Sequence, residues 1–152
     1  MNYWIFVVKD HLEAGRKIPV EEILDIRARE RFWLLSSRAA RTRNMEEGDE
    51  VIFYTTGERG RFFAGRARLH SKPKPITDSI RFYIRGSPSE ALTHYVELDS
   101  VELWKNPLNA EEVAPSLSFI KKKEKWPMAF RGSIRRISEE DYNRILERAV
   151  QA

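Results

Sequence analysis

Two neighbouring segments with the alternating pattern of strands constrain the fold of this chain most strongly. These segments are residues 51–55 and 61–70. The loop between them, at positions 57–60, contains two glycines, as hairpin turns often do. Gly65, in the middle of the second segment, indicates a bulge or a close backbone approach of the kind found where a barrel bends. Alternation predicts two faces for this segment, one with Phe63, Gly65, Ala67 and Leu69 and the other with Phe62, Ala64, Arg66 and Arg68.

The rest of the chain alternates between strand-like and helix-like patterns. Further strands are predicted over residues 2–8, 80–85 and 94–104, the first of them apolar on both faces. Helices are predicted from Pro19 to near Arg29, at 38–44 with Ser36 or Ser37 as cap, at 109–112, and after Ser138. The mixture predicts an α+β fold in which a small, partly closed and mostly antiparallel barrel is flanked by short helices.

Length and composition favour one soluble domain over residues 1–152. Hydrophobic residues make up 41% of the chain, and no apolar run approaches the roughly 20 residues that span a bilayer. The first ten residues lack a basic region and a cleavage site, so they predict a buried strand and a cytoplasmic protein. The absence of cysteine excludes disulfides, thiolate metal sites and a cysteine nucleophile. Together with abundant Glu, Lys and Arg, it is typical of a thermophile.

Positive charge is concentrated in two segments, although the net charge is only +4. Residues 31–43 contain four arginines, two aromatic residues and no acid, and residues 121–136 carry seven Lys or Arg against Glu124. A solvated loop is the alternative interpretation of such a run. Trp126 and Phe130 within the second segment favour a binding surface instead. The predicted phosphate-binding residues are Arg38, Arg41, Arg43, Lys121, Lys122, Lys123, Lys125, Arg131 and Arg135.

The sequence offers little for catalysis. His11, His70 and His94 are scattered, and no HxH, HExxH, GxSxG or GxxxxGK[ST] spacing occurs. We therefore expect a protein that is not an enzyme and that uses no metal or other cofactor.

An ordered series of short motifs resembles the PUA-like superfamily and, within it, the EVE domain, a relative of the YTH domain. The matching segments are Tyr3-Trp4-Ile5, Phe32-Trp33 ahead of Ser36-Ser37-Arg38, residues 45–49, 51–54 and 63–67, and Phe130-Arg131-Gly132 with Ile137 and Asp141. The resemblance covers essentially the whole chain. It implies a pseudobarrel with an aromatic-lined pocket, which in YTH relatives takes a methylated adenine of RNA. EVE relatives are thought to read modified bases in DNA or RNA.

The resemblance also implies roles for particular residues. Trp33 corresponds to a pocket wall, and Lys9, Asp10 and His11 correspond to a polar rim. From the sequence itself, Ser36, Ser37 and Asn44 are candidate polar contacts to a base, with helix capping as the alternative for each. Trp126 is a second candidate ring, and both Trp126 and Trp104 could instead belong to the core.

These observations favour a module that binds a base of RNA or DNA, in particular a modified base. Ring stacking would contribute roughly 1–3 kcal/mol, and the rim would read the hydrogen-bonding edge of the base. Two alternatives remain. One is an enzyme acting on nucleic acid, as in the related ASCH domains, with its acid or base drawn from Lys9, Asp10 or His11. The other is a protein-interaction module whose pocket is vestigial.

Overall fold

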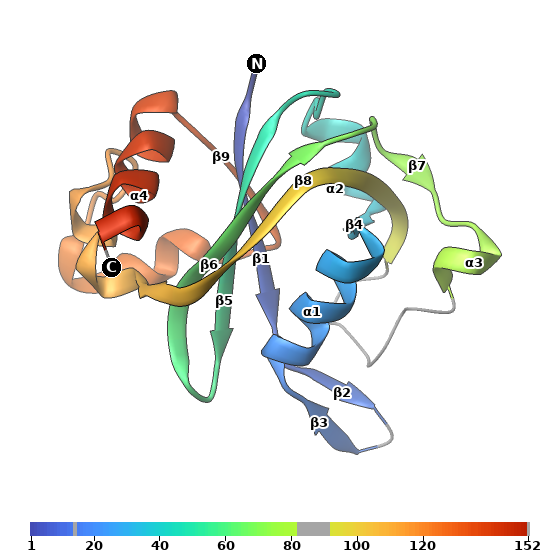
Figure 1. The fold of residues 1–152 in the computed structure, drawn as a ribbon, viewed down its shortest axis with the longest axis horizontal. Helices are drawn as coiled ribbons and strands as arrows, with labels where there is room; N and C mark the ends of the chain where they lie inside the picture. The colour runs from blue at the N-terminus through green and yellow to red at the C-terminus, as the bar shows by residue number, and fades with distance from the viewer. Residues whose placement is uncertain (14, 82–91, 152) are drawn as a thin grey trace.

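A single curled sheet runs through the middle of the computed structural model, which describes residues 1–13, 15–81 and 92–151 (Figure 1). Its strands follow the order β4-β8-β6-β5-β1-β9, and β7 (Lys74–Pro75) adds to β8. Their bounds are β4 (Phe32–Ser36), β8 (Leu92–Asn109), β6 (Gly60–Leu69), β5 (Glu50–Gly57), β1 (Tyr3–Lys9) and β9 (Ile134–Ile137). Only β1 and β5 pair in parallel within the described sheet. The predicted α+β half-barrel is confirmed.

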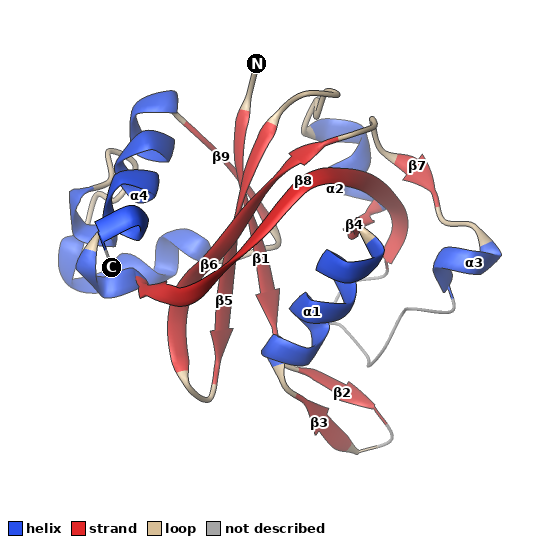
Figure 2. Ribbon diagram, in the orientation of Figure 1, coloured by secondary structure: helices blue, strands red, loops and turns tan. Residues whose placement is uncertain are grey.

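Helices cover both faces of the sheet (Figure 2). On one side lie α1 (Val20–Glu30) and α2 (Ser37–Thr42). On the other side α4 (Glu139–Gln151) lies with the 3-10 turns η1 (Ala110–Glu112), η2 (Ala114–Ser116) and η3 (Lys123–Phe130). A small hairpin of β2 (His11–Glu13) and β3 (Arg16–Ile18) projects below the sheet. Among the described residues, no helix has the length and apolar character needed to cross a membrane.

Strand β1 is apolar on both faces because it separates two cores. Trp4, Phe6 and Val8 point into the first core, toward α1. Ile5 and Val7 point into the second core, which α4 and the 3-10 turns close. Side chains alternate along a strand, so one buried strand supplies both cores.

The predicted hairpin is present, with β5 ending at Gly57 and β6 beginning at Gly60. The backbone comes close at Gly65, where an added Cβ would lie 2.3 Å from the carbonyl oxygen of Glu102 in β8. The register shifts there, between Phe63 and Gly65. The prediction that Phe63 shares a face with residues 65, 67 and 69 is wrong for this reason: Phe63 enters the second core, whereas Ala67 and Leu69 enter the first. An irregularity in pairing reverses the alternation.

The local capping chemistry largely follows the sequence. The Ser36 hydroxyl accepts the Ala39 amide at 3.1 Å and begins α2, and the Ser138 hydroxyl accepts the Asp141 amide at 3.1 Å and begins α4. The strand predicted over 80–85 is wrong at its start. Residues 80 and 81 belong to the short helix α3 (Asp78–Arg81), whose Ile80 amide approaches the Thr77 hydroxyl at 3.4 Å. Residues 82–85 lie outside the described residues.

Candidate nucleic-acid interface

A cationic pocket of about 290 Å³ opens at the hairpin end of the sheet. Three strands, the end of η3 and the residue that follows it build this pocket. Lys9 at the end of β1 lies opposite Thr56 of β5, and Thr56 in turn lies opposite Arg61 of β6. Arg131 follows η3 directly. The lining residues of this cationic pocket are Lys9, Tyr54, Thr56, Arg61, Pro127, Met128, Phe130 and Arg131, and no carboxylate is among them.

Stacked aromatic rings form the inner part of the cationic pocket. The rings of Tyr54 and Phe130 lie 4.3 Å apart and are nearly parallel, at 7°. Phe63 contacts both rings edge-on from within the second core. Burial raises the pKa of the Tyr54 phenol to about 12, an effect that the positive charge of Arg61 partly opposes. The phenol therefore stays protonated near neutral pH and can donate a hydrogen bond.

This arrangement is suited to an anion with several oxygens. Two guanidinium groups and an ammonium group supply charge-assisted donors, and the hydroxyls of Tyr54 and Thr56 supply neutral ones. Lys9, Arg61 and Arg131 are all exposed, so their attraction for an anion should weaken as salt is added. A phosphate group fits this chemistry better than a cation or an apolar ligand does.

The residues predicted to bind phosphate, like those of the cationic pocket, have no acid paired with them in the described part of the chain. Among the described residues, none of Arg38, Arg41, Arg43, Lys121, Lys122, Lys123, Lys125, Arg131 and Arg135 lies within ion-pair distance of a carboxylate. By contrast, Arg59 and Arg66 each approach a glutamate, at 3.7 and 3.4 Å. The predicted set therefore keeps charge that is available to a ligand.

Trp33 occupies a different environment from the exposed one that its predicted role suggests. Its side chain is 1% exposed and belongs to the first core. The indole stacks on Phe53 at 5.1 Å and 10°, contacts Phe6 at 5.4 Å, and carries the Arg27 guanidinium 4.6 Å from its centre. In this conformation Trp33 is a core residue and no ligand can reach its ring. Its role as a pocket wall stays a prediction, and it requires one of these neighbours to move.

Arg27 is a notable residue that the sequence reasoning missed. Its side chain is 6% exposed, and no carboxylate among the described residues pairs with it. Burial lowers its pKa to about 10. The available signal was its position, since it continues the apolar stripe of α1 one turn beyond Ile23 and Leu24. Contact with the indole face provides part of the compensation that an acid would otherwise supply.

The predicted polar rim is divided between two sides of the sheet. Lys9 lines the cationic pocket, whereas the Asp10 carboxylate turns toward α1 and accepts the Val20 amide at 2.8 Å. Asp10 also lines a separate cavity of about 550 Å³, here called the acidic cavity. Its other acids are Glu21, Glu22, Asp25 and Glu58. His11 lies in β2 opposite Ile18, and its side chain is outside the described part of the structure. Asp10 therefore acts as a helix cap in this conformation.

The remaining candidates for base contacts have structural contacts of their own. Ser36 caps α2, Ser37 is the first residue of that helix, and Asn44 is exposed in a left-handed conformation with φ of 55°. Trp126 is half-buried and meets Phe130 edge-on at 6.1 Å and 81°. Trp104 also packs against the second core. Trp126 directly precedes Pro127 of the cationic pocket, so it would lie near a ligand that entered this pocket.

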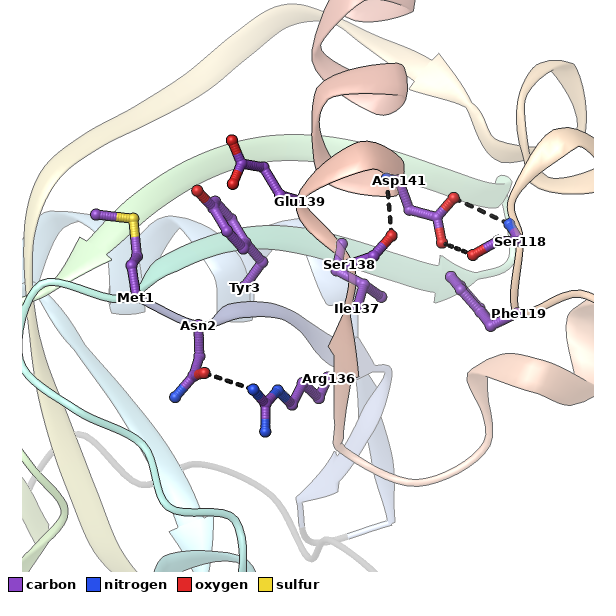
Figure 3. A pocket seen from close by; sticks show the side chains of 10 residues that line it. All are labelled: Met1, Asn2, Tyr3, Ser118, Phe119, Arg136, Ile137, Ser138, Glu139 and Asp141. Atoms are coloured by element: carbon purple, nitrogen blue, oxygen red, sulfur yellow. Dashed lines mark hydrogen bonds between the residues drawn. The ribbon is translucent and has the colours of Figure 1, made fainter.

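A third cavity, of about 400 Å³, lies between the N-terminus and the start of α4 (Figure 3). Its polar side chains are bonded to one another. The Arg136 guanidinium donates to the Asn2 side-chain oxygen at 2.7 Å, and Asp141 accepts the Ser118 amide at 2.9 Å. The first bond ties β9 to the N-terminus, and the second ties α4 to the segment before η3. Among the described residues, no group of three His, Asp or Glu side chains could hold a metal ion, here or elsewhere.

Comparison with known proteins identifies one family. The family model described as the EVE domain matches residues 2–148. No curated protein sequence matches the chain.

Solved structures share the fold at low sequence identity. Human THYN1, in complex with DNA containing 5-methylcytosine, is 18% identical with a TM-score of 0.64, and 98% of each chain is covered. A YTH domain of the Zygosaccharomyces rouxii MRB1 protein, in complex with N6-methyladenosine RNA, is 14% identical with a TM-score of 0.58. That match covers 95% of this chain and 85% of the other. A hypothetical protein from Leishmania major is 19% identical with a TM-score of 0.65, covering 99% and 96% of the two chains. The PUA-like pseudobarrel is therefore confirmed.

Proposed function

Because the chain belongs to the EVE domain family, we propose that it is a nucleic-acid-binding module that recognises a modified base of RNA or DNA without catalysing a reaction. Two proteins of the same fold support the proposal, one in complex with methylated DNA and the other with methylated RNA. The chemistry of this chain's own surface supports it independently.

The cationic pocket is the observation that carries the proposal. Lys9, Arg61 and Arg131 converge there from three distant parts of the sequence, with no acid beside them. A phosphodiester group is the anion that every nucleotide of a strand presents, and arginine binds it through a planar fork of donors. The exposed Met128 lines this pocket and the half-buried Trp126 adjoins it, so both could contact a neighbouring base or sugar.

Base recognition would take place on the other side of β1, where Trp33 lies. A base that entered this region would have to displace Arg27 or another neighbour of the indole. Part of the cost would be recovered because a flat aromatic base replaces a flat guanidinium on the same ring. We propose that the base must leave its stack to enter, so that single-stranded or mismatched nucleic acid binds better than a perfect duplex.

A pair of variants at the tip of the hairpin tests the proposal. Arg61 lines the cationic pocket, whereas Arg59, two residues earlier, lines the acidic cavity and pairs with Glu21 at 3.7 Å. Both are exposed arginines. Arg61→Ala should weaken binding of a single-stranded oligonucleotide about tenfold and make the log–log salt slope shallower by about 0.7. Arg59→Ala should bind as the unchanged protein does.

Two results would count against the proposal. One is an affinity of the unchanged protein for methylated and unmethylated oligonucleotides that is undetectable at low salt. The other is an equal loss in both variants, which would indicate a general charge effect in place of a pocket. Turnover of RNA, DNA or nucleotides that disappears in Asp10→Asn would favour the enzyme hypothesis. We propose instead that Asp10 has a structural role, as a cap of α1.

A further inference from the structure

Arg135 in β9 holds its guanidinium in an unusual setting. The group lies 4.3 Å from the centre of the Phe119 ring, and Nη1 donates to the Ala129 carbonyl oxygen at 3.3 Å. Its Nε is buried without a hydrogen-bond partner. A guanidinium group has five N–H donors, and the Ala129 oxygen is the only acceptor that the described residues provide. The side chain is therefore held in place but poorly satisfied.

No negative charge of the described protein compensates this group. Among the described residues, no carboxylate lies within ion-pair distance of the Arg135 guanidinium. Burial lowers the pKa of Arg135, and the positive charge of Arg43 lowers it further. A partly buried charge without a partner is costly, and an external anion would remove that cost.

The next residue along β9 provides a direct contrast. Because side chains alternate along a strand, Arg136 points away from Arg135, and its guanidinium donates to the Asn2 side-chain oxygen at 2.7 Å. Arg136 is exposed, whereas Arg135 is half-buried. The two residues therefore have the same type and charge but different surroundings.

The surroundings of Arg135 are continuous with the cationic pocket. Phe119, under the Arg135 guanidinium, meets Phe130 edge-on at 5.7 Å, and Phe130 lines that pocket. Ala129, which accepts from Arg135, precedes Phe130 directly. Arg135 follows Arg131 by four positions, so their Cα atoms are at most about 14 Å apart. A single nucleic-acid strand could reach both positions.

We infer that Arg135, held between Phe119 and Ala129, is a second anion site that binds a phosphodiester group of the same strand whose other phosphate occupies the cationic pocket. The inference rests on the proposed function and deepens it, because it gives the strand a direction across the surface, from the hairpin toward β9. Arg43 adds positive charge near Arg135. A guanidinium that is already oriented by an aromatic ring loses little freedom when it binds phosphate.

The experiment compares two ligand lengths. Binding of a dinucleotide and of a single strand of about eight nucleotides is measured for the unchanged protein, Arg135→Gln and Arg136→Gln. With the longer strand, Arg135→Gln should lower affinity about tenfold and reduce the salt slope by about 0.7. With the dinucleotide, which fills only the cationic pocket, Arg135→Gln should change affinity less than twofold. Arg136→Gln should change neither.

The two hypotheses fail in different ways. If the unchanged protein binds no oligonucleotide, the proposed function fails and takes this inference with it. If it binds the longer strand but Arg135→Gln matches Arg136→Gln, only the inference fails. Should Arg135→Gln not fold, the Arg135 Nε–H resonance of the unchanged protein decides. The chemical shift of this resonance should change when the longer strand is added and not when the dinucleotide is added. A chemical shift that changes with neither ligand would overturn the inference.

Discussion

Replacing Trp33 by alanine separates a core role from an exposed pocket role. The indole is 1% exposed and contacts Phe6, Phe53 and Arg27. An aromatic side chain of this size buries about 150–250 Å², which corresponds to about 4–6 kcal/mol at 25 cal/mol per Å². Measured losses for similar substitutions are about 3–5 kcal/mol. Losing the cationic contact to Arg27 would add up to about 2 kcal/mol.

We therefore expect Trp33→Ala to lose about 4–6 kcal/mol of unfolding free energy. A domain of this size has only about 5–15 kcal/mol in total, so the variant would be marginal at room temperature. Each kcal/mol lowers the melting temperature by about 2–4 °C, which predicts a fall of roughly 10–20 °C. Trp126→Ala is the matched control, because the same residue type is half-buried there and should lose less.

The assay combines a thermal melt and a denaturant titration of Trp33→Ala with a binding titration of the same variant. Affinity can then be expressed per folded molecule. A variant that melts within about 2 °C of the unchanged protein would refute the reasoning, because a side chain that fills the core cannot be removed at no cost. If the same variant also lost affinity, Trp33 would be a pocket wall after all, and the conformation with Arg27 against it would be a minor one.

Two further predictions concern buried ionisable groups. Arg27→Met should leave the unfolding free energy unchanged or raise it by about 1–4 kcal/mol. The reason is that an apolar chain of similar length replaces a buried charge that has no acid beside it among the described residues. A loss of more than about 2 kcal/mol in a denaturant titration would show that the cation is needed for stability. Folding raises the pKa of Tyr54 to about 12 from an ordinary value near 10, so its contribution to stability is complete below pH 10 and is lost as pH rises toward 12. Tyr54→Phe should accordingly flatten the decline of unfolding free energy between pH 10 and 12, and unfolding curves of equal pH dependence for both proteins would contradict the assignment.

Much of the fold could be predicted because its signals are local. The caps Ser36 and Ser138, the hairpin turn at 57–60 and the crowded Gly65 each depend on a few neighbouring residues. The face of Phe63 could not be predicted, because the register shifts at this point in the pairing of β6 with both β5 and β8, and β8 lies about 40 residues away. Alternation fixes faces only while the pairing is regular.

The site was predicted in parts but not as an arrangement. Lys9 and Asp10 are adjacent in sequence and were expected to share a rim, yet they serve opposite sides of the sheet. Arg61 was not expected to bind phosphate, since it is the first residue of an ordinary strand pattern. It acquires that chemistry only because β5 places it beside Thr56 and Lys9. Convergence of this kind depends on strand order, which cannot be inferred from the local patterns of a single sequence.

The comparison of Arg27 with Arg135 explains why net charge is a poor guide to the function of this protein. Both guanidinium groups lie on an aromatic ring, at 4.6 and 4.3 Å, and neither has an acid beside it among the described residues. Arg27 is enclosed by the core, so its charge reaches no ligand unless the core opens. Arg135 is half-buried in β9, the strand at the edge of the sheet, so its charge is less enclosed than that of Arg27. The number of cations therefore matters less than which of them remain accessible and, within the described part of the chain, unpaired, and Lys9, Arg61 and Arg131 of the cationic pocket are among those.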